Sequence, residues 1–469
     1  MPTRWNPSGR AKSACSATHR GPRASRRAGR HRGHGTGRGC GAPRLRSAPR
    51  GARSLVSSWC ETPAELAELV GGAVRARDRL GARTLGDAAE ALGAAAVRWG
   101  TDAQLLADLP AVARLSPPLV AAAVRIAAAA IDTRAMRALV EHEFGAGAAG
   151  RPAPRGPSLI GHVLAGNVPA LGVPAIALGC LVGAAVVVKS GHDDPLSAPA
   201  FHRALEAVDP LLAAAVVTAY WPGGERSWEE AAFARADLVV ASGTDETVAA
   251  LAGRLGARLL AHGDRVSVAA VSREGLGRDE PLLERLALDI ALHDQRGCLS
   301  PRAVYVEADG SPSPQAFAER LAAALDAVAR ELPPGPAGVE ERAALRLLAD
   351  EAEWEPGSRV LNGAGGLVVY DPRPAFRPTT GRRTIRVHAV NNLAALPLIL
   401  APGRVECVGL AASGPEVAAL VPALRALGVA RVCPIGRMQQ PALAWPRGQR
   451  LPLGSLLGRP GPDVLEVEG

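Results

Sequence analysis

The spacing of apolar positions changes from helical to strand-like near residue 158. Between residues 60 and 150, apolar residues recur three or four positions apart, as Leu66, Leu69 and Val70 do, which predicts amphipathic helices. After residue 158, short β-branched runs alternate with helical stretches. These runs cover residues 159–164, 184–188, 214–220, 238–241 and 266–271. Such alternation predicts an α/β fold with a parallel, doubly wound sheet.

Helix-start signals support the helical prediction for the first of these parts. Thr62, Pro63 and Glu65 have the pattern of a capping box with proline at the first helical position. A second amphipathic stretch begins at Thr84, and a third, rich in alanine, begins at Ser116. We find no motif in this part that carries chemistry.

The run of residues 163–188 contains no charged side chain over 26 positions, which is long enough to cross a bilayer as a helix. Asn167, Pro169, Pro174 and four glycines interrupt it, and in lipid each freed backbone group would need a partner. A buried succession of strand, loop, helix and strand is therefore favoured over a membrane span.

Basic charge is concentrated at the N-terminus. Residues 1–60 carry 14 basic and no acidic residues, whereas the other 409 residues carry 40 basic and 45 acidic ones. Residues 1–58 lack apolar clusters and are predicted to be a disordered tail. Nucleic-acid binding through this tail is the non-enzymatic alternative, although the mildly acidic remainder offers no footprint for DNA or RNA. Gly37, Gly39 and Ala42 match a dinucleotide fingerprint, but no strand precedes them.

Cysteine usage excludes two kinds of site. The seven cysteines are odd in number, widely separated and never spaced as CxxC, so neither a disulfide framework nor a zinc site is predicted. Cys180, Cys407 and Cys433 lie in apolar segments and are predicted core residues. A reducing cytoplasm is the expected compartment, because the N-terminus lacks the apolar stretch of a secretory signal.

Two polar motifs follow the first two predicted strands, where ligands of such sheets gather. Asn167 can aim its amide at a developing oxyanion, or can simply form the turn. Lys189 ends the second strand and precedes Ser190 and His192. Because the chain uses 52 arginines and only two lysines, a lysine here indicates the need for a compact ammonium, as beside a phosphate or a ribose. A strand-end lysine in solvent is the alternative.

Two further motifs occur later in the chain. Gly243 and Thr244 follow a strand and open a helix whose N-terminus could approach a phosphate, although ordinary turns look the same. Cys298 lies in a polar segment between a helix and a strand. Because a thiolate requires polar surroundings and access, this cysteine is the best nucleophile candidate.

A Cys–His hydrolase is the rival chemistry for the same cysteine. His262, His293 and Asp294 could supply its base and its orienting group. A dehydrogenase fits the four motifs with fewer assumptions.

In this order and spacing, the motifs resemble the aldehyde dehydrogenase superfamily, and most closely its LuxC-type acyl-CoA (fatty acyl) reductases. The segments that carry the resemblance are 162–169 (HVLAGNVP), 189–191 (KSG), 262–263 (HG), 294–301 (DQRGCLSP), 428–432 (GVARV) and 445–446 (WP). The resemblance covers roughly residues 150–469.

This resemblance implies a role for each candidate. Cys298 would be the nucleophile and Asn167 the oxyanion-hole asparagine, while His262 would polarise the carbonyl, shuttle a proton or cap its loop. The residues expected to bind the cofactor are Lys189, Ser190, His192, Gly243 and Thr244. Aldehyde-oxidising members use a glutamate to hydrolyse the thioester, but the corresponding residues 259–263 contain no carboxylate. A thioacyl enzyme would therefore be protected from water and reduced to an aldehyde.

The resemblance also implies the cofactor and substrate. NAD-preferring relatives often place a glutamate three residues after the lysine, whereas this chain has His192, so NADPH is expected, with NADH as the alternative. No metal is expected. The expected substrate is an acyl-CoA or acyl-carrier thioester, with a fatty acyl chain implied by the resemblance alone. A reductase of an acyl phosphate is the runner-up, and a Cys-dependent thioester hydrolase or transferase comes third.

Partners and domains complete these expectations. The resemblance implies an acyl-transferase or synthetase partner and a homo-oligomer, with neither a membrane span nor a nucleic acid. The predicted organisation is a tail (1–58), a helical N-terminal part of the cofactor domain (59–150), a dinucleotide-binding domain (151–274), a catalytic domain (275–435) and a C-terminal arm (436–469).

Overall fold

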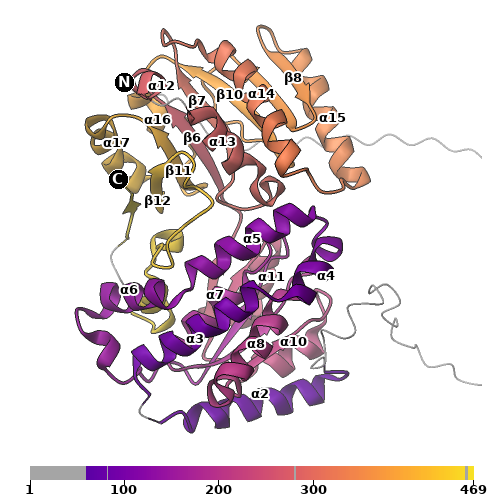
Figure 1. Cartoon of the computed structure of the whole chain (residues 1–469), viewed down its shortest axis with the longest axis vertical. Helices are drawn as coiled ribbons and strands as arrows, with labels where there is room; N and C mark the ends of the chain where they lie inside the picture. The colour runs from indigo at the N-terminus through magenta and orange to yellow at the C-terminus, as the bar shows by residue number, and fades with distance from the viewer. Residues whose placement is uncertain (1–59, 82, 279–280, 460–462, 469) are drawn as a thin grey trace, which may run out of the picture. The chain divides into compact units, whose positions relative to one another are not determined.

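The computed structural model describes residues 60–81, 83–278, 281–459 and 463–468 (Figure 1). The predicted basic tail and the glycine pattern at residues 37–42 lie outside these residues.

The N-terminal part is helical, as the periodicity predicted. Its helices are α2 (Pro63–Asp78), α3 (Leu85–Gly100), α4 (Ala103–Ala113), α5 (Pro117–Ala130) and α6 (Thr133–Phe144). The Thr62 side chain accepts a hydrogen bond from the backbone N–H of Glu65, and Thr84 and Asp87 form a reciprocal capping box. Each of these two helices therefore begins where its capping residue predicted.

The first sheet is parallel, five-stranded and covered on both faces. Its strand order is β3 (Val216–Ala219), β2 (Ala185–Lys189), β1 (Leu159–Val163), β4 (Leu238–Ser242) and β5 (Leu259–His262). On one face Ile160 and Val186 pack in a core with α3 and α7 (Gly172–Leu181). On the other, Leu159 and Val187 pack in a core with α2 and α10 (Arg226–Phe233). This arrangement confirms the predicted doubly wound fold. The remaining helices here are α8 (Ser197–Val208), α9 (Pro210–Ala213) and α11 (Asp245–Leu255).

The second sheet has eight strands and is parallel except for one pair. Its order is β13 (Glu466–Val467), β12 (Arg431–Pro434), β11 (Val405–Ala411), β6 (Val266–Val271), β7 (Pro301–Glu307), β10 (Thr384–Val390), β9 (Gly366–Asp371) and β8 (Arg359–Gly363), with β8 antiparallel to β9. Its helices are α12 (Arg273–Arg278), α13 (Leu282–Ala291), α14 (Pro314–Glu331), α15 (Val339–Glu353), α16 (Leu396–Ile399) and α17 (Gly414–Ala426). The last helix, α18 (Pro452–Leu456), packs instead in the core of the first sheet, against α7.

One strand lies in a different sheet from the one that its sequence pattern suggested. Residues 266–271 were grouped with the first sheet, but as β6 they pair with β7 and β11 in the second. The last strand of the first sheet is instead β5, just before them in sequence. A buried parallel strand has the same apolar pattern in either sheet, so the pattern alone does not distinguish them. The predicted domain boundaries remain predictions.

The uncharged run at residues 163–188 forms the end of β1, a loop, α7 and β2, as predicted. Within the part of the chain that the structure describes, no single helix is both long and apolar enough to span a membrane. The helices α4 and α5 are long and apolar enough only when they are counted together, and the chain bends by 119° between them.

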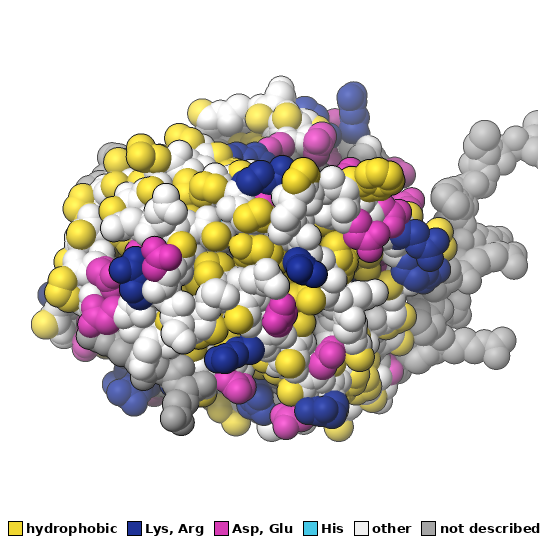
Figure 2. Space-filling model, turned by 90° about the horizontal axis from the view of Figure 1, so that it is seen from above, with side chains coloured by type: hydrophobic (Ala, Val, Ile, Leu, Met, Phe, Trp, Pro, Cys, Tyr) yellow, Lys and Arg dark blue, Asp and Glu magenta, His cyan; other side chains and the backbone are white. Residues whose placement is uncertain are grey.

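Charge is mixed over the face of the molecule seen in Figure 2. Basic and acidic side chains lie side by side there, in small groups of both signs. This described surface therefore offers no broad stripe of positive charge of the kind that tracks a nucleic-acid backbone.

Candidate active site

The loops after β1 and β2 meet through two glycines. An added Cβ at Gly191 would lie only 2.4 Å from the Cα of Gly166, so the two backbones approach as only glycine permits. The buried carboxylate of Asp194 accepts hydrogen bonds from the backbone N–H groups of Ala170 (2.7 Å) and Ser197 (3.0 Å). The motif that contains Asn167 is thereby tied to the motif that follows Lys189.

Asn167 lies against the loop that carries Cys298. Its side-chain amide donates a hydrogen bond to the backbone carbonyl of Arg296 (2.7 Å). An added Cβ at Gly297 would lie 3.4 Å from Cγ2 of Val168, which is ordinary van der Waals distance between the two loops. The amide nitrogen of an asparagine carries two hydrogens, so this bond leaves the second one for another acceptor.

The residues before Cys298 adopt a left-handed run of backbone. From His293 to Gln295 the φ angles are 55°, 50° and 59°, a region that costs roughly 1 kcal/mol or more per residue other than glycine. The Gln295 side chain holds this run: it donates to the carbonyls of Pro301 and Thr384 and accepts from the Thr384 N–H, each at 2.7 Å. The backbone that leads into Cys298 is thus held by a buried amide.

Asp294 fixes the same run with its carboxylate. It pairs with Arg383 (2.9 Å) and Arg382 (3.1 Å) and accepts a hydrogen bond from the Gly335 N–H (2.8 Å). The neighbouring His293 is buried, and among the described residues its Nδ1 has no hydrogen-bond partner. Burial lowers the pKa of His293 to about 4. The Asp294 carboxylate is therefore engaged by two arginines and a backbone N–H. This arrangement argues against Asp294 as the group that orients the histidine of a Cys–His hydrolase.

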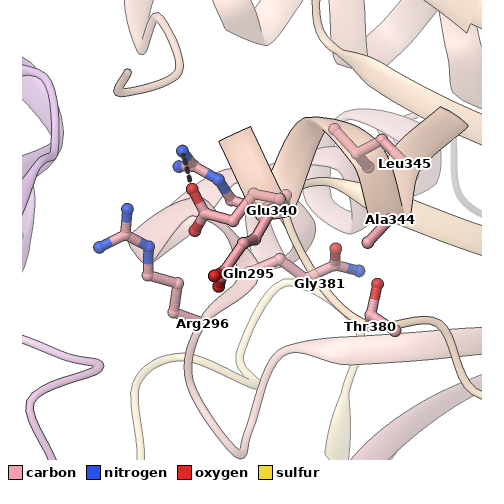
Figure 3. A pocket seen from close by; sticks show the side chains of 9 residues that line it. Gln295, Arg296, Glu340, Ala344, Leu345, Thr380 and Gly381 are labelled. Atoms are coloured by element: carbon pink, nitrogen blue, oxygen red, sulfur yellow. Dashed lines mark hydrogen bonds and ion pairs between the residues drawn. The ribbon is translucent and has the colours of Figure 1, made fainter. Parts of the chain in front are cut away.

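Arg296 joins this loop to the N-terminal helices. Its guanidinium donates to the carbonyls of Ala113 (2.8 Å) and Arg114 (3.1 Å) at the end of α4. A cavity of about 290 Å³ borders the loop, α15 and residues 380–382, with Arg296 on one side and Leu345 of α15 on the other (Figure 3). The loop that contains Cys298 is therefore bonded to the end of α4 and shares a cavity with α15.

Cys298 borders a second, smaller cavity of about 110 Å³. His262 at the end of β5 and Arg447 from the C-terminal segment share its wall, which is completed by Ala261, Gly263, Arg265, Glu406, Gly448 and Arg450. The hydroxyl of Ser267, in β6, donates to the backbone carbonyl of Cys298 (2.7 Å). The thiol is therefore half-buried beside a wall that is rich in charged groups.

Glu406 is a carboxylate in this wall that the motifs did not reveal. It lies where the register of β11 against β6 shifts, between Val405 and Cys407. Its side chain is buried, pairs with Arg265 (3.2 Å) and accepts a hydrogen bond from the Gly448 N–H (2.9 Å). Both of its oxygens are therefore engaged.

Cys298 and His262 have opposite pKa shifts. Burial raises the pKa of the Cys298 thiol, and the charge of Arg447 opposes this effect. Burial, together with the positive charges of Arg447 and Arg450, lowers the pKa of His262 well below its ordinary value. The cavity thus favours a neutral imidazole beside the thiol.

The residues around Lys189 have the chemistry of a nucleotide-binding site. Its ammonium lies 6.0 Å from the ring centre of Tyr220, burial lowers its pKa, and Glu229 opposes that effect. The Ser190 hydroxyl is buried and has no hydrogen-bond partner among the described residues. His192 is exposed, and its Nδ1 lies 2.9 Å from the Tyr220 hydroxyl. A cation and an unpaired hydroxyl at this strand end fit a ribose or phosphate oxygen.

Gly243 and Thr244 lie beside the end of β5. The Gly243 N–H donates to the carbonyl of His262 (3.3 Å), and Thr244 caps α11. The first turn of α11 carries Asp245 and Glu246, which stabilise the helix N-terminus but oppose a phosphate there. The cofactor role of Gly243 and Thr244 stays a prediction.

The structure therefore brings Asn167, His262 and Cys298 into one region and joins the Lys189 motif to it. Sequence reasoning missed Glu406 and Arg447, which reach the cavity from distant segments. The signal near Arg447 was the Trp-Pro pair just before it. Within the described ranges, no group of three or more His, Cys, Asp or Glu side chains is arranged to hold a metal ion.

Comparisons with known proteins identify the family and the fold. The model of the acyl-CoA reductase (LuxC) family matches residues 96–448. Aldehyde dehydrogenase 21 from Physcomitrella patens, solved with the product succinate, is 14% identical, with 85% of this chain and 89% of that chain covered and a TM-score of 0.68. No curated protein sequence matches the chain.

Two other solved structures have the same fold. An NAD-dependent benzaldehyde dehydrogenase from Corynebacterium glutamicum is 14% identical over 81% of this chain and 88% of that one, with a TM-score of 0.63. Glyceraldehyde-3-phosphate dehydrogenase GapN from Methanocaldococcus jannaschii, complexed with NADP, is 13% identical over 80% and 86%, with a TM-score of 0.59.

The fold is thus that of the aldehyde dehydrogenases, which confirms the predicted class. Because the family model spans most of the chain, this protein belongs to the LuxC acyl-CoA reductase family. It is an oxidoreductase whose family reduces acyl groups to aldehydes.

Proposed function

We propose that this protein reduces an acyl thioester to an aldehyde with NADPH, through a thioacyl intermediate on Cys298. The observation that carries the proposal is the hydrogen bond from Asn167 to the carbonyl of Arg296, because it brings an amide donor to the loop of Cys298, which borders a cavity. The substrate is an acyl-CoA or an acyl-carrier thioester.

The first chemical step is transfer of the acyl group. The Cys298 thiolate attacks the thioester carbonyl, a new carbon–sulfur bond forms, and the carrier thiol leaves after the tetrahedral intermediate collapses. The second N–H of Asn167 and the backbone N–H of Cys298 stabilise the oxyanion, an effect worth about 3 kcal/mol for one donor. If a bound nicotinamide supplied hydride to the thioester carbon, the thiohemiacetal oxyanion held by the same two donors would collapse, break the carbon–sulfur bond and release the aldehyde and the Cys298 thiolate.

Reduction competes with hydrolysis, and the wall of the cavity favours reduction. No carboxylate lies in residues 259–263, and Glu406, which does border the cavity, is held by Arg265 and by the Gly448 N–H. Both oxygens of Glu406 are therefore already engaged. Hydrolysis of the thioacyl enzyme should therefore be slow, and the acyl group should stay on Cys298 until it is reduced.

The chain has residues that fit a nicotinamide dinucleotide. Lys189 and the Ser190 hydroxyl would hold the adenosine ribose beside the close approach of Gly166 and Gly191. Position 192 holds a histidine and not a glutamate. A histidine side chain does not repel a 2′-phosphate as a carboxylate would, which supports NADPH over NADH. When bound, the nicotinamide supplies the hydride.

The experiment is a panel of acyl-CoAs with NADPH or NADH, in which the loss of reduced-nicotinamide absorbance is followed. We expect NADPH oxidation with at least one acyl-CoA, and none with the Cys298→Ala variant. Equal activity of that variant would overturn the covalent route. Activity with acyl phosphates but not with thioesters would identify the alternative substrate class.

A truncated chain that lacks residues 1–58 provides the second test. The enzymatic proposal predicts that this chain retains reductase activity. Loss of all activity, with the fold intact by circular dichroism, would favour a function that resides in the basic tail.

A further inference from the structure

Arg447 reaches the Cys298 cavity from the C-terminal segment and is held there from two sides. Its guanidinium donates to Oγ of Ser242, at the end of β4 (2.9 Å). The backbone N–H of the next residue, Gly448, donates to the buried carboxylate of Glu406 (2.9 Å). One bond fixes the side chain and the other fixes the backbone, so the cation has a defined place in the cavity wall.

We propose that Arg447 is a positioning residue whose fixed charge stabilises the thiolate form of Cys298, so that a fixed cation, and not a histidine base, activates the nucleophile. This inference rests on the proposed function, in which Cys298 carries the acyl group. The Cys298 proton then leaves to solvent, and no imidazolium forms.

The charged and titratable groups that face Cys298 come from every element packed around it. They are His262 (β5), Arg265 (before β6), Arg302 (β7), Glu406 (β11), and Arg447 and Arg450 (C-terminal segment). The single carboxylate is paired with Arg265. Arg450 is exposed, whereas Arg447 is partly buried and bonded to Ser242. Two cations, Arg447 and Arg302, favour the thiolate, and Arg447 has the larger effect and a side-chain hydrogen bond that fixes its place.

Arg447 acts on the thiol and the imidazole in opposite senses. Its positive charge favours the thiolate of Cys298, against the raising effect of burial on the thiol pKa. The same charge lowers the pKa of His262, because it disfavours a second cation nearby. A thiolate–imidazolium pair, as in cysteine hydrolases, would need His262 to be protonated. Burial and the nearby positive charges disfavour the protonated form of His262.

The test is the pH profile of Cys298 alkylation by iodoacetamide, read by peptide mapping so that the other cysteines are excluded. In the Arg447→Gln variant we expect the midpoint of the profile to rise by about half a pH unit or more, and the rate at pH 7 to fall about threefold or more. Arg447→Lys should keep most of the wild-type profile. Arg447→Met replaces the Gln variant if the latter fails to fold.

Two variants of the same wall separate electrostatics from damage to the fold. Glu406→Gln removes the negative charge near the thiol, so its midpoint should move down. His262→Gln should leave the midpoint in place or lower it. Arg137→Gln, on α6 and paired with Glu90, is the matched control and should change nothing.

The outcomes decide between the two modes of activation. An unchanged midpoint in both neutral Arg447 variants, or a midpoint that rises in His262→Gln, would overturn the inference in favour of a histidine-paired thiolate. The alkylation profile does not depend on reductase turnover. Failure of the proposed function would instead appear as reductase activity in Cys298→Ala.

Discussion

The side-chain amide of Asn167 donates to the backbone carbonyl of Arg296, two residues before Cys298, at 2.7 Å. This bond joins the loop after β1, in the first sheet, to the loop before β7, in the second. The Arg296 side chain in turn donates to carbonyls at the end of α4. One short chain of hydrogen bonds thus links Asn167, the loop that contains Cys298 and the end of α4.

Asn167→Ala should lower kcat by about a hundredfold, because one oxyanion donor is worth about 3 kcal/mol in the transition state. Asn167 is exposed, so the melting temperature should change little. The measurement is steady-state kinetics with an acyl-CoA and NADPH, with the alkylation rate of Cys298 as a control for the nucleophile. A loss of alkylation equal to the loss of kcat would indicate a displaced thiol in place of a missing donor.

Gln295→Ala should destabilise the fold by about 2–3 kcal/mol, because it removes three hydrogen bonds and leaves the buried N–H of Thr384 without the acceptor that Gln295 provides. The left-handed run before Cys298 would then lose its main restraint, and kcat should also fall. Urea unfolding measures the first effect. Gln315→Ala, at an exposed i to i+4 pair with Glu319, is the matched control and should stay within about 0.5 kcal/mol of wild type.

Gly191→Ala should weaken nucleotide binding, because the added methyl would meet the backbone of Gly166 at 2.4 Å. The neighbouring atoms are backbone and cannot move aside as a side chain could, so the loops after β1 and β2 must separate. Titration of NADPH by fluorescence measures the effect. Gly253→Ala in α11, where an added Cβ meets nothing within 4 Å, should bind as wild type does. Wild-type affinity in both variants would show that these loops do not form the nucleotide site.

His162→Leu should reduce the loss of stability in acid. His162 is buried in β1, its Nε2 has no hydrogen-bond partner among the described residues, and burial lowers its pKa to about 4. The folded-state pKa lies below the ordinary value of 6.5, so the neutral form contributes stability that is complete above pH 6.5 and is lost as the pH falls towards 4.

The size of this effect follows from the same shift. Between pH 7 and pH 4.5 the wild type should lose about 2 kcal/mol through this group, and the leucine variant should not. His293 has the same shift and remains in both proteins as an internal reference. Urea unfolding at the two pH values measures the difference. Parallel losses in wild type and variant would contradict the assignment.

The sequence revealed those features of the fold and site that depend on neighbouring residues. Helix caps at Thr62 and Thr84 and the apolar runs of β1 and β2 have a local cause, and each was predicted. The candidate residues Cys298 and Lys189 were singled out for the same reason, since Cys298 stands in an unusually polar segment and Lys189 in an arginine-rich chain, and their roles stay predictions.

Features that depend on tertiary contact were not predictable from one sequence. Arg447 meets Ser242 across 205 positions, and the pattern of neither residue indicates the other. In the sequence, Glu406 has the pattern of an ordinary strand residue. Its place in the cavity wall depends on a register shift in β11 and on an ion pair with Arg265. The sheet to which β6 belongs depends likewise on its pairing partners, since apolar β-branched strands are equally suited to both sheets.

The most direct test of the central claim is the intact mass of the protein after it is mixed with an acyl-CoA in the absence of any nicotinamide cofactor. A thioacyl enzyme that is protected from water should accumulate, so we predict one added acyl group, mapped to Cys298 and discharged when NADPH is added. An unmodified mass, or an acyl group that persists in Cys298→Ala, would contradict the claim.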